Sequence, residues 1–151
     1  MRESTTNDPA TGESSAHQRR SDGEKWLSGF VSLIGLWIAV SPFVYEQAAS
    51  MLWNNLLVGG ASFLLAGYNY YRLTNSYATS TGVMSLVALL GLWVFISQWA
   101  IAGEFAMSGL KAASTALIWS NVLSGLVAAA LSAYIAYTGG REVPRGTAAQ
   151  T

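Results

Sequence analysis

The sequence predicts an all-α, polytopic membrane protein with four transmembrane helices, arranged as two tandem, parallel two-helix repeats. Four apolar runs carry this prediction, because none contains Asp, Glu, Lys, Arg or His; they cover residues 26–45, 51–71, 82–103 and about 113–138. A bilayer core about 30 Å thick needs about 20 apolar residues per helix, so each run is long enough to cross. Charged residues make up only 11% of the chain, which leaves no polar faces for a water-soluble bundle.

Residues 1–25 are rich in Ser, Thr, Gly and charge, and they contain no large aliphatic residue after the initiating Met. Such a segment buries too little apolar surface to offset the entropy of ordering it. We therefore expect a disordered cytoplasmic tail here. The segment also lacks the apolar core of a signal peptide, so we expect it to be retained.

Residues 26–71 form the first predicted repeat, which consists of two spans joined by a short turn. Pro42 has no N–H, so the carbonyl of Ile38 loses its helical partner, and the Ser41 hydroxyl or a neighbouring helix can satisfy it. We expect the first span to kink or end there. The second span begins at Trp53, Asn54 and Asn55.

Residues 72–81 form a predicted cytoplasmic linker, and residues 82–138 repeat the first unit. The motif GLW at residues 35–37 recurs at residues 91–93, an offset of 56, and WNN at residues 53–55 recurs as WSN at residues 119–121, an offset of 66. The second hairpin therefore has about ten extra residues near residues 104–113. Because each unit has two spans, a pseudo-two-fold axis along the membrane normal relates the copies. Residues 139–151 form a second predicted tail, short and flexible.

At these motifs the chain resembles the SPW-repeat family of small prokaryotic membrane proteins, over roughly residues 26–138. The first unit reads GLWIAVSPF followed by MLWNNLLVGG, and the second reads GLWVFISQW followed by LIWSNVLSG. Phe43 replaces the Trp of the Ser-Pro-Trp signature in the first copy, and Gln98 replaces the Pro in the second. The resemblance implies architecture and membrane location, and it brings no activity with it.

Each hairpin is expected to gather a hydroxyl, an amide and an indole just below the outer membrane surface. These groups are a candidate ligand or headgroup pocket, and the alternative is interhelical hydrogen bonding with an aromatic anchor. Gln98 keeps a backbone donor and adds an amide that can bond across helices. The candidate outer cluster consists of Ser41, Pro42, Trp53, Asn54, Asn55, Ser97, Gln98, Trp119 and Asn121.

Small side chains recur every four residues along the fourth span and form a candidate helix-packing face. Small side chains let another helix approach closely, so packing and hydrogen bonds can drive association in lipid. The face points either to the pseudo-axis or to a sister subunit. It consists of Ser120, Ser124, Ala128, Ser132 and Ala136.

Orientation follows from the basic residues near the span ends. Six Lys or Arg lie on the side of the two termini, at residues 19, 20, 25, 72, 141 and 145, whereas only Lys111 lies on the other side. The positive-inside rule then predicts a multi-pass protein of the cell membrane with both termini in the cytoplasm.

Catalysis is not predicted. The chain has no Cys and a single His at position 17, which leaves no thiol chemistry, metal triad or general base, and we expect no cofactor and no metal. Zero net charge without a basic stripe predicts no nucleic-acid partner. Two function classes remain: a structural or interaction module that contacts the bilayer and associates with itself or other membrane proteins, and a small channel or carrier for a neutral solute.

Overall fold

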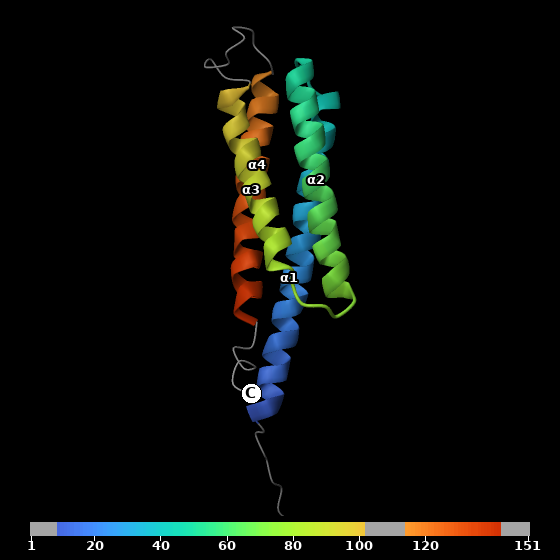
Figure 1. The fold of residues 1–151 in the computed structure, drawn as a ribbon, viewed down its shortest axis with the longest axis vertical. Helices are drawn as coiled ribbons and strands as arrows, with labels where there is room; N and C mark the ends of the chain where they lie inside the picture. Colours follow the sequence, from blue (N-terminus) through green and yellow to red (C-terminus); the bar gives the residue numbers. More distant parts are fainter. Residues whose placement is uncertain (1–8, 102–113, 143–151) are drawn as a thin grey trace, which may run out of the picture.

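Four long helices lie side by side in a computed structural model that describes residues 9–101 and 114–142 (Figure 1). They are α1 (Pro9–Val40), α2 (Ala49–Thr74), α3 (Thr81–Ala100) and α4 (Thr115–Gly139), and 3₁₀ turns at Ser41–Phe43 and Gly140–Glu142 follow α1 and α4. All four are long and apolar enough to cross a membrane, which confirms the all-α polytopic prediction. The predicted extra loop near residues 104–113 lies outside the described residues.

The helices form a ring in which each repeat stays together as a hairpin. The closest packing joins α1 to α2 and α3 to α4, and the pairs α2 with α3 and α1 with α4 complete the ring. Figure 1 shows the two hairpins as neighbouring pairs. Exchanging α1 with α3 and α2 with α4 leaves this order unchanged, as the pseudo-two-fold prediction requires.

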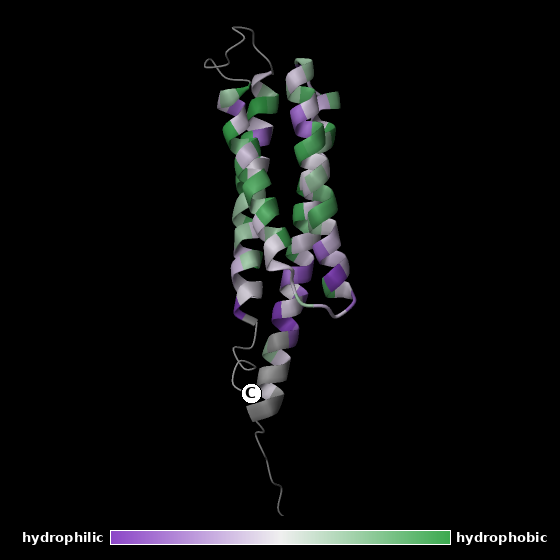
Figure 2. Ribbon diagram, viewed as in Figure 1, coloured by the Kyte–Doolittle hydropathy of each residue, from purple (hydrophilic) through white to green (hydrophobic). Residues whose placement is uncertain are grey.

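The two ends of the bundle differ in polarity. At the hairpin end α1 turns into α2 and α3 leads to α4; at the terminal end α1 begins and α4 finishes (Figure 1). Figure 2 shows apolar residues along the middle of the bundle and hydrophilic residues at its terminal end, in α1 and at the end of α2. This distribution is typical of a helical bundle that crosses a bilayer.

The prediction of a disordered tail over residues 1–25 is wrong from Pro9 onward, because α1 begins there. Tertiary contacts explain the difference. Glu24, which is 3% exposed, accepts a hydrogen bond of 2.6 Å from the Thr79 hydroxyl, and Arg20 lies 3.9 Å from Glu24 and donates to the Thr138 carbonyl. Once these contacts hold residues 20–24 in the helix, each further residue added toward Pro9 costs little free energy.

Smaller differences affect the other predicted segments. The linker shortens because α2 continues to Thr74 and α3 starts at Thr81. Of the predicted flexible end, Gly139 belongs to α4 and Gly140–Glu142 form a 3₁₀ turn. Residues 1–8 and 143–151 lie outside the described part.

Glycines bring the two helices of each hairpin into backbone contact. A Cβ on Gly59 would lie 2.5 Å from the Ala39 nitrogen, and a Cβ on Gly125 would lie 2.8 Å from the Gly91 oxygen. Gly59 and Gly125 are equivalent at the offset of 66. The same close crossing is thus built twice, and a methyl group at either point would force backbone atoms to shift.

The interior holds an apolar cluster in the terminal half and buried polar side chains toward the hairpin end. Aliphatic side chains from all four helices fill the terminal half; they are Val31, Ala66, Met84, Val87, Ile135 and Ala136. Met51 and Leu117, which are equivalent at the offset of 66, form a second small cluster near the hairpin end. Between these clusters lie buried Asn, Gln and Ser side chains, which form the site described next.

Candidate functional site at the hairpin end

The first repeat closes its site with a proline turn. Helix α1 ends at Val40, and Ser41–Phe43 continue as a 3₁₀ turn with Ser41 and Pro42 buried. The Ser41 hydroxyl donates a hydrogen bond of 3.1 Å to the Ile38 carbonyl. The carbonyl that Pro42 leaves without a backbone donor is thereby satisfied, as the sequence predicts.

The second repeat satisfies the equivalent carbonyl without a proline. The Ser97 hydroxyl donates a hydrogen bond of 2.9 Å to the Val94 carbonyl, and the Gln98 side-chain amide donates a second one of 2.9 Å to the same oxygen. Because Gln98 retains its backbone N–H, α3 runs on to Ala100. One residue type therefore decides whether the first helix of a repeat breaks or continues.

Two tryptophans join the repeats to each other in a reciprocal pattern. The Trp37 indole N–H donates a hydrogen bond of 2.9 Å to the Ser120 hydroxyl. The Trp93 indole N–H donates one of the same length to the Asn54 side-chain oxygen. Trp37 and Trp93 are equivalent at the offset of 56, and Asn54 and Ser120 at the offset of 66. Each repeat thus supplies one donor and one acceptor to this contact between the repeats, which we call the hairpin-end seam.

Buried amides extend this network into the interior. The Asn54 side-chain amide donates two hydrogen bonds of 3.3 Å, one to the Ser97 hydroxyl and one to the Asn55 side-chain oxygen. The Asn121 amide donates 3.4 Å to the Gln98 side-chain oxygen. Asn55 and Asn121 are fully buried, yet Asn55 Nδ2 and Asn121 Oδ1 have no hydrogen-bond partner within the described residues.

The predicted contribution of Trp53 and Trp119 to this cluster is not observed. Their side chains are 58% and 61% exposed, on the outer surface of the bundle. Residues two apart on a helix point in nearly opposite directions, so Trp53 faces outward when Asn55 faces inward. Trp37 and Trp93 supply the indole N–H groups instead, and the repeated GLW motif was the available signal for them.

The candidate packing face on α4 lies largely inside the chain's own bundle. Ala128, Ser132 and Ala136 are buried, and Ser120 and Ser124 are partly buried. Ser120 accepts the Trp37 bond, and Ser132 Oγ has no partner among the described residues. Ala128, Ser132 and Ala136 are therefore already covered by other helices of the same chain.

A second polar cluster at the terminal end was missed by the sequence reasoning. It contains the Glu24 contact with Thr79 and two hydrogen bonds of the Asn69 side chain. The Asn69 NH₂ group donates a bond of 2.9 Å to the Ser28 hydroxyl, and its oxygen accepts one of 2.8 Å from the Ser80 N–H. The sequence predicts a tail at Glu24 and an apolar span at Asn69. A carboxylate four residues after Arg20 is a helical signal that could have extended the first helix.

Chemically, these clusters supply hydrogen bonds and one buried carboxylate. Within the described ranges no group of three His, Cys, Asp or Glu side chains is placed to hold a metal ion. The hairpin-end groups are hydroxyls, amides and indoles, none of which is charged. They can bind neutral polar groups or one another.

The chain matches the model of a known protein family. The SPW repeat domain matches residues 25–135 of the chain, and this range contains both copies of the motif and all the hairpin-end residues described above. No match was found among curated proteins or among solved structures.

Proposed function

The chain belongs to the SPW repeat family, and we propose that it is a non-enzymatic scaffold that holds a rigid helix at the membrane surface for other proteins. Family membership and four apolar helices make it a multi-pass integral membrane protein. The observation that carries the proposal is the course of α1, which is one helix from Pro9 to Val40. A continuous helix transmits the orientation of the bundle to its projecting part.

The exposed side of α1 at the terminal end of the bundle, where the projecting part begins, carries charges of both signs. Arg19, Arg20 and Asp22 are exposed, and Lys25 pairs with Asp22 at 3.3 Å. Glu24 faces inward and fixes the helix to Thr79. A mixed-charge surface on an oriented helix favours recognition of a complementary protein surface. With six basic residues on this side, we place the projecting helix and both termini in the cytoplasm of the cell.

The inward position of the α4 small-residue face supports recognition by α1 over self-association through α4. Ala128 and Ser132 have exposed fractions of only 1% and 0%. A second copy could reach them only by opening the bundle. We therefore assign partner contacts to the projecting helix and to the outward-facing side chains of the bundle.

A conduit for a neutral solute is the second candidate, and the orphaned Asn55 and Asn121 amide atoms favour it. The filled terminal half of the interior weighs against it, because Val31, Met84 and Ile135 are all fully buried there. A solute that reached the amides would meet this apolar plug. In proteoliposomes we expect glycerol influx equal to that of empty liposomes; faster influx that Asn55→Leu abolishes would favour the conduit.

The scaffold proposal is tested by breaking the projecting helix without changing the bundle. Ala16→Pro removes a hydrogen bond and introduces a clash in the helix interior, whereas Ala10→Pro lies in the first turn, where proline is tolerated. After cross-linking in native membranes and purification in mild detergent, we expect Ala16→Pro to lose proteins that Ala10→Pro and the unmodified chain retain. Identical co-purifying proteins from all three would contradict the proposal.

A further inference from the structure

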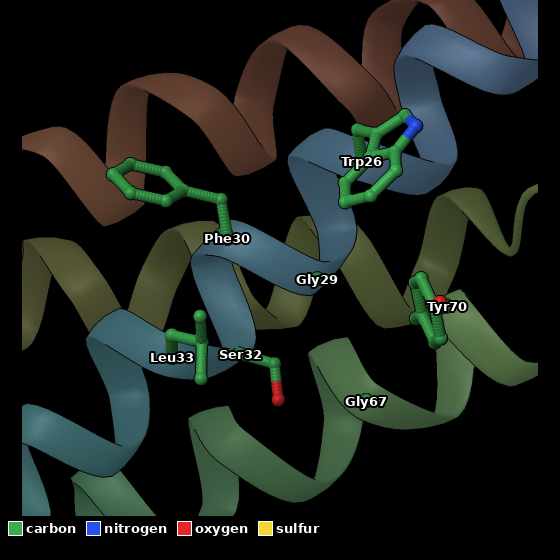
Figure 3. A pocket seen from close by; sticks show the side chains of 7 residues that line it. All are labelled: Trp26, Gly29, Phe30, Ser32, Leu33, Gly67 and Tyr70. Atoms are coloured by element: carbon green, nitrogen blue, oxygen red, sulfur yellow. The ribbon is translucent and has the colours of Figure 1, made fainter.

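Two grooves of nearly equal size open on the outer surface, one in each repeat. The first lies between α1 and α2 and has a volume of about 440 Å³ (Figure 3). Small residues form its floor and larger ones its walls; they are Gly29, Ser32 and Gly67, then Trp26, Leu33 and Tyr70. The second lies between α3 and α4 and has a volume of about 460 Å³, with Ser85, Ala88 and Ala133 beside Leu89 and Tyr137.

The pseudo-two-fold relation maps one groove onto the other. Gly29 corresponds to Ser85 and Leu33 to Leu89 at the offset of 56, and Gly67 corresponds to Ala133 at the offset of 66. Small residues of different types thus create the same hollow in both repeats. Both hollows lie in the terminal half of the bundle, where the residues that face outward contact the bilayer.

A cationic side chain lies at the terminal rim of each groove. Lys25 precedes Gly29 by one helical turn, so both lie on the same face of α1. Arg141 follows Tyr137 by one turn, stacks over the Tyr137 ring at 4.3 Å from its centre, and donates a hydrogen bond to the Tyr137 hydroxyl. Among the described residues Lys25 pairs with Asp22 in an exposed contact, which a competing anion can replace.

We propose that each groove binds one anionic phospholipid of the leaflet on the side of the termini. An acyl chain lies in the apolar hollow, and the headgroup phosphate meets Lys25 at the first groove and Arg141 at the second. The volumes are in the range of small-molecule sites, about 300 to 1,000 Å³. Basic pockets at the membrane surface are a recurring mode of anionic lipid recognition.

A phospholipid fits these hollows better than a transmembrane helix does. Close packing of a partner helix is favoured where small residues repeat along a helix face. On α1 the strip ends at Leu33, which is 61% exposed, and Leu64 on α2 is 67% exposed. Leu33 lines the hollow, and Leu64 lies about one turn from Gly67 on α2, on the side away from the terminal end. Leu89, which is 63% exposed, lines the second hollow at the position equivalent to Leu33, so each hollow is a local pocket with its charged end at the membrane surface.

The proposal is tested by counting retained lipids in native mass spectra. The full-length chain is reconstituted with phosphatidylglycerol or with phosphatidylcholine and released into the mass spectrometer. We expect two retained phosphatidylglycerols and none of phosphatidylcholine. Lys25→Gln and Arg141→Gln should each remove one of the two, and the double variant both, whereas Arg19→Gln, an equal charge change away from the grooves, should keep both.

Filling one hollow separates groove binding from surface attraction. Ala133→Phe places a ring in the second groove, and Ala130→Phe adds the same ring to an exposed position of α4 outside it. We expect Ala133→Phe alone to lose one lipid, with both variants retaining the wild-type melting temperature. Equal retention of the two lipid classes, unchanged counts in the double charge variant, or a protein dimer in place of lipid adducts would overturn the proposal.

Discussion

At the scale of single residues, equivalent positions carry different chemistry to the same end. Pro42 and Gln98 are equivalent, and in both repeats a serine hydroxyl bonds the carbonyl three residues earlier. The serine works with either neighbour, because its bond does not depend on whether the next residue has a backbone N–H. This explains how two incomplete copies of the motif build one site.

The reciprocal indole bonds predict the effect of Trp37→Phe and Trp93→Phe. Phenylalanine keeps an aromatic ring but removes the donor, so each change should lower the free energy of unfolding by about 0.6 to 1.7 kcal/mol. Thermal unfolding in detergent measures this. Trp53→Phe and Trp119→Phe serve as controls, since their indoles lie outside the bonds that join the two repeats. Equal losses of stability in the controls would show that the indole bonds are not the cause.

The buried amides predict an asymmetry between two equivalent positions. Asn121→Leu strands the Gln98 side-chain oxygen in the interior, whereas Asn55→Leu leaves Asn54 its bond to Ser97. An unsatisfied buried acceptor costs about 1 to 3 kcal/mol, so Asn121→Leu should lower the melting temperature more than Asn55→Leu. The reverse order, measured in the same detergent, is incompatible with the network as described.

At the scale of helices, the fold is two tightly crossed hairpins whose contact points are glycines. The sequence predicts the helices, the repeat and the turn at Pro42, because apolar length, periodic motifs and proline are local signals. It could not place Glu24, because the helix before Trp26 is held by Thr79 and Thr138, which lie far away in the chain. Nor could it choose between Trp37 and Trp53 before the facing of each helix was known.

The glycine crossings predict that Gly59→Ala and Gly125→Ala destabilise the hairpins. Their added methyl groups would meet backbone atoms at 2.5 and 2.8 Å, and overpacking of this kind typically costs about 1 to 3 kcal/mol. Gly60→Ala is the matched control on α2, since its Cβ would meet nothing within 4 Å. A loss of stability in Gly60→Ala as large as in Gly59→Ala would show that helix crossing is not the cause.

At the scale of the whole molecule, the orientation of the bundle determines where the projecting helix acts. Six basic residues on the side of the termini predict that both ends are cytoplasmic. A reporter that is active only outside the cytoplasm should be silent when fused at Met1 or Thr151, and active when inserted at Glu104. Activity at both termini would reverse the orientation and place the projecting helix outside the cell.

The central claim is that the two repeats dock into one bundle through the hairpin-end seam. The chain has no natural cysteine, so Asn54→Cys with Ser97→Cys tests the seam directly where these side chains now meet at 3.3 Å. On mild oxidation in native membranes, we predict an internal disulfide at the monomer mass, with no bridge for Asn54→Cys with Ser85→Cys. Failure of the first pair to bridge, or bridging only between copies, would contradict a single bundle built from both repeats of one chain.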